Sequence, residues 1–140
     1  MRALVDTCVI VDALQSRAPF AEVAQKIFLS SANMQFEGYI TAKSVTDIYY
    51  LTHRLTHSDE QTRNILSKLF TLFKLLDTTS LDCRKAISSE ISDYEDAIMV
   101  ETAIRSGMDC IVTRNAKDYI KASVKVYEPD VFLGILEKEK

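Results

Sequence analysis

Short apolar stretches alternate along this chain with longer segments of helical periodicity, and this alternation restricts the fold more than any other feature. The stretches that resemble strands lie at residues 3–5, 38–40, 74–77, 110–112 and 124–127. The helical segments lie between them, at residues 7–14, 19–32, 44–55, 58–73, 81–89 and 93–106, and a last one starts at 129. Strands that alternate with helices predict an α/β domain with a mainly parallel, roughly five-stranded sheet covered on both faces.

Residues with strong preferences for helix ends indicate where several of these helices start or stop. We expect Thr7 to cap the first helix and Pro19 to open the second. Ser44 and Asp47 have the spacing of a capping box at the start of the third helix. Gly107 is expected to end the helix before the fourth strand.

The length and composition indicate one ordinary globular domain over residues 1–140. The chain is 47% hydrophobic and 26% charged, with only 3 Gly and 2 Pro, which favours dense regular structure. No apolar run approaches the ~18 residues that span a bilayer, and Asp6 and Asp12 interrupt any signal-peptide core. We therefore expect a cytoplasmic protein without a membrane partner.

The cysteines and histidines do not indicate a soft metal site. Cys8, Cys83 and Cys110 are odd in number and not at metal-ligand spacing, so we expect free thiols. His53 and His57 are four residues apart, which suits a metal pair on a helix, but no Glu accompanies them as in the zinc peptidases. Zinc is therefore disfavoured.

Charge is distributed unevenly, although the net charge is only −3. Residues 75–101 hold seven anions and two cations, whereas residues 102–126 hold five cations and two anions. The small net charge argues against a bulk electrostatic grip on nucleic acid. An acidic focus beside a basic segment suits metal ions and a phosphate chain, but charge alone favours ordinary solvated surface.

Four aspartates are expected at the carboxyl edge of the predicted sheet, where ligands bind in such folds. They are Asp6 after the first strand, Asp47 after the second, Asp96 in the helix before the fourth, and Asp118 after the fourth. Clustered carboxylates repel one another unless cations neutralise them, and hard oxygen ligands suit Mg²⁺ or Mn²⁺. Two such ions about 3.5–4 Å apart can hydrolyse phosphodiesters.

Each aspartate also has an ordinary structural explanation. An aspartate at a strand end is often a turn residue, and Asp47 has capping spacing from Ser44. Asp93 and Asp96 suit the N-terminus of a helix through its dipole. The joint pattern, rather than any single residue, favours a metal site.

At this point the chain resembles the PIN-domain family along essentially its whole length. Leu4-Val5-Asp6-Thr7 with Val9-Ile10 is similar to the family's first motif, and Asp93-Tyr94-Glu95-Asp96-Ala97-Ile98 to its third. Residues 111–119, Ile-Val-Thr-Arg-Asn-Ala-Lys-Asp-Tyr, resemble its last motif, and residues 127–133 its usual ending.

The resemblance implies a three-layer α/β/α sandwich and metal-dependent endonucleolytic cleavage of RNA, with one or two Mg²⁺ or Mn²⁺ ions. Many relatives are toxins of toxin–antitoxin pairs, form homodimers and are silenced by a small antitoxin protein. Asp6, Asp96 and Asp118 would be the metal ligands, and Asp47 a further catalytic residue. Asp93, Thr113 and Asn115 would support the site, and Arg114 and Lys117 would meet RNA phosphates.

Two positions depart from the family pattern. The family commonly has Asn two residues after the first Asp, where this chain has Cys8, so support for Asp6 must differ. The second acid is usually Glu in the toxins, whereas the best match is Asp47, which is shorter by one methylene and could act through water.

Two other functions remain open. An aspartate-nucleophile phosphatase would also place Asp6 after the first strand, but its general acid belongs at the position of Cys8. A PIN-like module without activity would bind RNA or a protein, and only an active site is expected to bind Mn²⁺.

The segment at residues 45–76 is apolar on more than one helix side, which predicts an interface between two copies. Ile48 and Tyr49 can face the core, so Tyr50 and Leu51 should point elsewhere, because helix neighbours are ~100° apart. Coverage by another helix of the same chain is the alternative.

Overall fold

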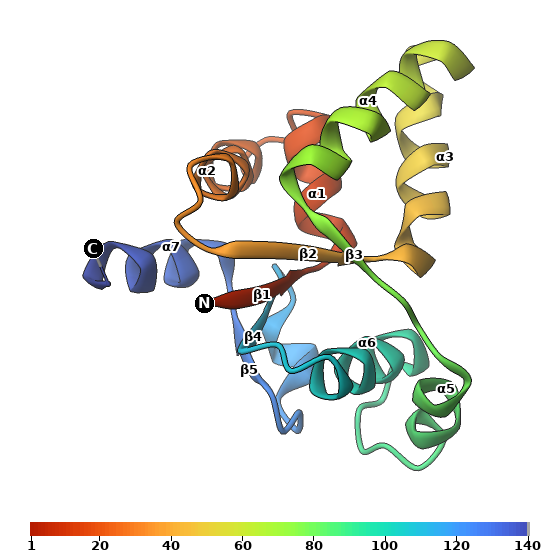
Figure 1. Ribbon diagram of the computed structural model, residues 1–140, viewed down its shortest axis with the longest axis vertical. Helices are drawn as coiled ribbons and strands as arrows, with labels where there is room; N and C mark the ends of the chain where they lie inside the picture. The colour runs from red at the N-terminus through yellow and green to blue at the C-terminus, as the bar shows by residue number, and fades with distance from the viewer. Residues whose placement is uncertain (140) are drawn as a thin grey trace.

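A five-stranded parallel sheet forms the centre of the computed structural model, which describes residues 1–139 (Figure 1). The strands are β1 (Arg2–Val5), β2 (Glu37–Thr41), β3 (Lys74–Leu76), β4 (Cys110–Val112) and β5 (Lys125–Tyr127). Their order is β3-β2-β1-β4-β5, and all four neighbouring pairs are parallel. The predicted strands and their parallel arrangement are confirmed.

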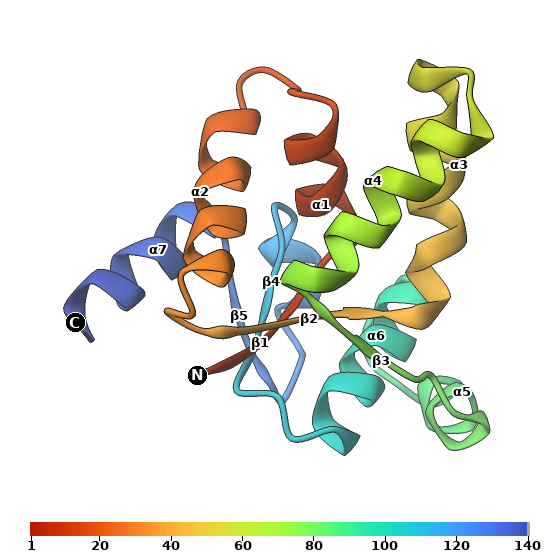
Figure 2. The same ribbon diagram turned by 45° about the horizontal axis from the view of Figure 1, so that its top comes forward.

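Helices cover both faces of this sheet. They are α1 (Thr7–Leu14), α2 (Ala21–Ala32), α3 (Val45–Thr56), α4 (Asp59–Leu72), α5 (Ser80–Ala86), α6 (Tyr94–Arg105) and α7 (Pro129–Lys138), with short 3₁₀ turns η1 (Ala42–Ser44) and η2 (Ala116–Tyr119). Figures 1 and 2 show α1 to α4 on one side of the sheet and α5 and α6 on the other. The result is the expected three-layer α/β/α sandwich.

Alternating strand residues divide the core into two clusters. Ala3 and Val5 of β1 pack with residues of α1 to α4 and α7, whereas Leu4 packs with residues of α5 and α6. Cys110 and Val112 of β4 face the first cluster, and Ile111 faces the second. Successive side chains of a strand point to opposite faces, so the short central strands are apolar throughout.

Two helix starts differ from the sequence expectation. Asp6, not Thr7, caps α1, because the Asp6 carboxylate accepts a hydrogen bond from the Thr7 amide at 2.8 Å. Pro19 does not open α2: the amides of Phe20 and Ala21 both bond back to the Arg17 carbonyl, which closes a turn and delays the helix to Ala21.

Two further helix ends also differ. The Ser44 hydroxyl makes no capping bond to α3, because it pairs at 2.6 Å with the buried Thr41 hydroxyl. The helix expected up to Ser89 ends at Ala86, after which the amides of Ile87 to Ser89 bond in tighter turns. The stop at Gly107 is confirmed, with a positive φ of 70°.

Only part of the apolar surface expected on α3 and α4 is exposed. Leu51 and Leu72 pack against the core of the same chain, so the expectation that Leu51 points away from the core is wrong. Tyr50 is 62% exposed and Leu55 60%, and Phe70 is also exposed. Across residues 1–139, no helix is long and apolar enough to cross a membrane.

Candidate active site

Asp6 lies at the carboxyl end of β1, the central strand of the sheet. Its amide donates to the Val112 carbonyl at 2.9 Å, so the end of β1 is fixed against the end of β4. Its side chain then caps α1, as described above. The strand and the helix therefore set the position of this carboxylate from both sides.

Two further side chains orient the Asp6 carboxylate. The buried Thr113 hydroxyl donates to Asp6 Oδ2 at 2.8 Å, and the Cys8 thiol donates to the same oxygen at 3.6 Å. The Cys8 sulfur also lies 3.7 Å from Thr113 Oγ1. Thr113 thus orients the Asp6 carboxylate, while its role in a catalytic site stays a prediction, and Cys8 supplies a weak bond where the family commonly has Asn.

Asp96 lies in the first turn of α6, and a buried tyrosine orients it. The Tyr119 hydroxyl donates to Asp96 Oδ1 at 2.9 Å. Burial, together with the charges of Asp6 and Asp96, raises the pKa of Tyr119, so this hydroxyl stays neutral and remains a donor. Asp93 caps α6 by accepting a bond from the Asp96 amide at 3.0 Å, which is the structural role expected at a helix start.

The carboxylates at this edge repel one another electrostatically. Burial raises the pKa of Asp96 to about 6, and the charges of Asp93, Asp6 and Asp118 add to that increase against the Tyr119 bond. Burial also raises the pKa of Asp6, while the bonds from Thr113, Thr7 and Cys8 oppose the increase. Two of the predicted aspartates, Asp6 and Asp118, therefore act on a third, Asp96.

Asp118 and its neighbours lie on η2, directly after β4. Asp118 is exposed, and its amide donates to the Asn115 carbonyl at 2.9 Å. The Asn115 amide in turn donates to Thr113 Oγ1 at 3.2 Å, so the turn is tied to the residue that orients Asp6. Lys117 and Asp118 border a hollow of about 270 Å³ beside this turn.

Asp47 is less closely associated with this group. It is exposed in the first turn of α3, and it is not among the charges named above that shift the pKa of Asp6 and Asp96. Its catalytic role stays a prediction.

Sequence reasoning missed Tyr119 as well as a second acid, Glu95. The charge of Glu95 contributes to the raised pKa of Asp6, and Glu95 forms an ion pair with Lys43 at 3.1 Å. Glu95 directly precedes Asp96 in the sequence. Because neighbouring residues of a helix usually point about 100° apart, only one of the two is expected from the sequence to face the site. Lys43 brings a cation from η1 to the same edge.

Arg114 does not extend freely into solvent. Its guanidinium Nε bonds to Asp12 Oδ2 at 2.7 Å, and its charge lies 4.2 Å from the centre of the Phe20 ring. Its predicted contact with RNA phosphate therefore competes with an ion pair inside the protein.

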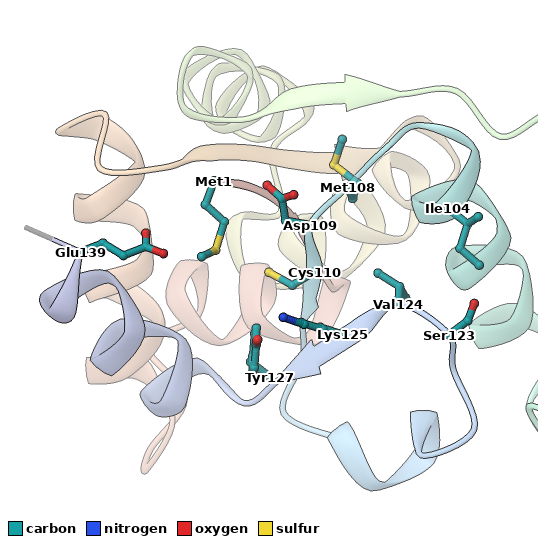
Figure 3. A pocket seen from close by; sticks show the side chains of 10 residues that line it. All are labelled: Met1, Ile104, Met108, Asp109, Cys110, Ser123, Val124, Lys125, Tyr127 and Glu139. Atoms are coloured by element: carbon teal, nitrogen blue, oxygen red, sulfur yellow. The ribbon is translucent and has the colours of Figure 1, made fainter.

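A wider hollow, of about 760 Å³, lies at the opposite end of the sheet (Figure 3). Met1, Cys110 and Lys125 border it, and these residues precede or begin β1, β4 and β5. The carboxyl group of Asp109, also in its wall, already accepts the Arg2 amide at 2.8 Å. Asp6 follows β1 and Asp118 follows β4, so this hollow lies at the other edge of the sheet from them.

The PIN-domain family model matches residues 2–117 of this chain. The chain belongs to the PIN-domain family. Among curated proteins, none matches the chain.

Solved structures show the same PIN fold. A toxin–antitoxin complex from Klebsiella pneumoniae matches with a TM-score of 0.68 and 21% identity, over 91% of this chain and 97% of that one. DNA-bound VapBC from Salmonella typhimurium matches with a TM-score of 0.66 and 11% identity, over 92% and 98%. FitAcB from Neisseria gonorrhoeae matches with a TM-score of 0.64 and 20% identity, over 91% and 97%.

The donors of this PIN domain fit a hard cation by their chemistry. Asp6, Asp96 and Asp118 offer only carboxylate oxygens. Burial and the neighbouring acids together raise the Asp96 pKa, and a bound cation would offset both effects. Within residues 1–139, no three His, Cys, Asp or Glu side chains are grouped closely enough to hold a metal ion alone. Mg²⁺ does not need three protein ligands, because it keeps several waters and binds through one or two carboxylates plus substrate phosphate.

Proposed function

We propose that this PIN domain is an endoribonuclease that depends on Mg²⁺ or Mn²⁺. The observation that carries the proposal is the state of Asp96 at the carboxyl edge of the sheet, where burial, with the charges of Asp93, Asp6 and Asp118 added, raises its pKa to about 6. Carboxylates held together at such a cost are typical of sites that bind cations and substrates.

Asp6 and Asp96 are the residues best placed to hold the metal, since other side chains orient both carboxylates. Thr113 and Cys8 fix Asp6, and Tyr119 fixes Asp96. The metal would polarise the phosphodiester and lower the pKa of an attacking water. Asp118 is exposed on η2, where its carboxylate can complete the site through a water molecule or hold the substrate side of the cation.

The remaining predicted residues have supporting roles in this proposal. Asp93 fixes the start of α6 and adds its charge to the site. Asn115 ties η2 to Thr113, and Lys117 is exposed beside Asp118, where it can meet an RNA phosphate. Asp47 would act through water from the first turn of α3.

We further propose that the protein is the toxin of a toxin–antitoxin pair, acts in the cytoplasm and forms a homodimer. The structures with which it shares its fold are described as a toxin–antitoxin complex, VapBC and FitAcB. A small antitoxin protein would then be its natural inhibitor.

Cleavage of a labelled single-stranded RNA by the purified protein tests the nuclease proposal. Activity should vanish in EDTA, return with Mg²⁺ or Mn²⁺, and be absent in Asp96→Asn. Asp130→Asn is the matched control, because Asp130 also lies in the first turn of a helix but is exposed. Cleavage that continues unchanged in EDTA would contradict the metal mechanism.

A PIN-like module that binds RNA without cutting it is the second candidate. The replacement of the usual Asn by Cys8, whose thiol reaches Asp6 only at 3.6 Å, is the observation that favours it. Titration with Mn²⁺ distinguishes the two functions. Binding that Asp96→Asn abolishes supports the nuclease, whereas a wild-type protein that binds RNA but no Mn²⁺ supports the module.

A further inference from the structure

An ion pair between a buried aspartate and a partly exposed arginine joins α1 to the segment after β4. Asp12 of α1 is only 1% exposed, and its two carboxylate oxygens accept Arg114 Nε at 2.7 Å and Nη2 at 3.2 Å. The guanidinium also lies over the Phe20 ring. The fork of two bonds fixes the direction of Arg114 as well as its distance, which a single contact would not do.

The two elements that this pair joins are the ones that carry the oriented Asp6. Asp6 caps α1, the helix of Asp12. Arg114 lies between Thr113, which bonds to Asp6 Oδ2, and Asn115, whose amide bonds to Thr113 Oγ1. Any displacement of Arg114 relative to α1 would therefore change the contact between Thr113 and Asp6.

The same connection continues into η2. The Asp118 amide bonds to the Asn115 carbonyl, and Tyr119, the next residue, bonds to Asp96. A chain of short contacts thus runs from Asp12 through Arg114 and Asn115 to two acids of the proposed site. Burying an ion pair is weak evidence for a gain in stability, because desolvation offsets much of the attraction. Fixing the geometry is a role that the contacts themselves indicate.

We propose that Asp12 and Arg114 are positioning residues of the active site, which hold residues 113–119 so that Thr113 orients Asp6 and η2 presents Asp118. This inference rests on the proposed nuclease function and deepens it. Arg114 acts here through Thr113 and Asn115, and its charge is used by Asp12 rather than by RNA.

A second ion pair between an arginine and a buried aspartate provides the control. Arg105 Nε bonds to Asp82 Oδ1 at 2.9 Å, and the Asp82 carboxylate is as deeply buried as that of Asp12. This pair joins α5 to the last turn of α6, and Arg105 bonds to the Asp82 carboxylate and the Asp77 carbonyl, both outside residues 113–119. Arg114→Met and Arg105→Met each leave a buried aspartate without its cation, so both should lower the melting temperature.

The test measures hydrogen exchange, Mn²⁺ affinity and RNA cleavage in the two variants. In Arg114→Met, the amides of Asn115 and Asp118 should exchange at least about tenfold faster, and Mn²⁺ affinity should fall about 10–100-fold, as for other outer partners of metal ligands. kcat should fall while KM changes less. Arg105→Met should leave all of these at the wild-type value.

Two further variants extend the test: one applies if Arg114→Met does not fold, and the other replaces arginine conservatively. If Arg114→Met does not fold, Asp12→Leu/Arg114→Met removes the pair without leaving a buried charge, and it should fold but show the same exchange and Mn²⁺ defects. Arg114→Lys keeps one charged contact and should recover part of the Mn²⁺ affinity.

The outcomes separate this inference from the proposed function. Unchanged exchange at Asn115 and Asp118 in the Arg114 variants would overturn the positioning role, whatever the nuclease result. Faster exchange in a protein whose wild type neither binds Mn²⁺ nor cleaves RNA would overturn the nuclease and, with it, any role of Asp12 and Arg114 in catalysis.

Discussion

At the scale of single residues, Asp96 combines a favourable and an unfavourable position. Negative charge near the start of α6 suits the helix dipole, and the Tyr119 hydroxyl bonds to the carboxylate. Burial and the neighbouring acids nevertheless raise its pKa to about 6. The folded protein therefore holds this proton more tightly than the unfolded chain, which makes ionised Asp96 a cost to the metal-free fold.

Linkage gives the sign of the resulting pH dependence. Between about pH 4 and pH 6 the unfolded state loses the Asp96 proton first, so the contribution of this group to stability falls as pH rises through that window. Asp96→Asn removes the contribution and should leave the metal-free protein as stable as the wild type at low pH and more stable at pH 7. Thermal melts in EDTA across this range measure the difference between the two proteins.

Only the difference in stability between the wild type and Asp96→Asn isolates Asp96, because the contributions of other acids to stability change with pH in the opposite direction. The pKa of Asp82, bonded to Arg105, is lowered, so its contribution is lost as pH falls. A variant that melts clearly below the wild type at pH 7 would show that Asp96 mainly supports the helix.

Thr113 allows a second test at the residue scale. Thr113→Val preserves the shape but removes the bond to Asp6 and the acceptor of the Asn115 amide. We expect a loss of about 1–2 kcal/mol in stability from the unpaired buried groups. Mn²⁺ affinity, measured by calorimetry, should fall about 10–100-fold because Asp6 loses its orientation.

Thr102→Val is the control for this change. Thr102 is also fully buried, and its hydroxyl donates to an aspartate, Asp82, at 3.3 Å. It should lose comparable stability and keep its Mn²⁺ affinity. Equal losses of affinity in the two variants would show a general loosening of the fold instead of a specific role for Thr113.

At the scale of elements, the sequence predicts where strands end better than it predicts which side chains contact one another. Apolar runs that end in Asp6 and lead to Asp118 identify the site edge, because the carboxyl ends of parallel strands meet there. The pair of Asp12 and Arg114 joins residues 102 positions apart, and no local pattern reports such a contact. The sequence does not indicate the bond between Tyr119 and Asp96 either. Tyr119 resembles an ordinary core residue there, and only the turn geometry of η2 directs its hydroxyl to Asp96.

The same reasoning explains the errors at helix ends. Thr7 and Ser44 are good capping residues by type, yet their neighbours decide the outcome. Asp6 already caps α1, and the Ser44 hydroxyl has a partner in Thr41. Capping preferences therefore located the helix starts to within a residue or two without identifying the group that makes the bond.

The turn η2 leads to a prediction about RNA contacts. Because Arg114 is engaged by Asp12, Lys117 is the better candidate for a phosphate contact among the two cations expected there. Lys117→Ala should reduce the slope of log affinity against log salt by about 0.7, the value for one phosphate contact on a single strand. Fluorescence anisotropy of the protein–RNA complex in metal-free buffer measures this slope.

Lys26→Ala removes an equal charge from α2, on the opposite face of the sheet from Tyr119, and should leave the slope unchanged. A slope that Lys117→Ala does not alter would place the RNA path away from η2.

At the scale of the whole molecule, the hairpin of α3 and α4 carries apolar side chains that the chain itself does not cover. Tyr50, Leu55 and Phe70 are exposed there, and Figure 1 shows the two helices extending together away from the sheet. Leu51 and Leu72 are packed into the core, which narrows the exposed surface to those three residues. We predict that this surface joins two copies of the chain.

Light scattering at micromolar concentration should give about twice the monomer mass of 15.8 kDa. Tyr50→Ser/Leu55→Ser should produce a folded monomer with an unchanged melting profile at low concentration, because neither side chain contributes to the core. Ile87→Ser/Ile120→Ser is the control, since these residues are still more exposed but lie outside the hairpin, and it should stay dimeric. A wild-type mass near 15.8 kDa would refute the dimer. If only Ile87→Ser/Ile120→Ser disrupts the dimer, the interface lies on the α5 and η2 side of the molecule.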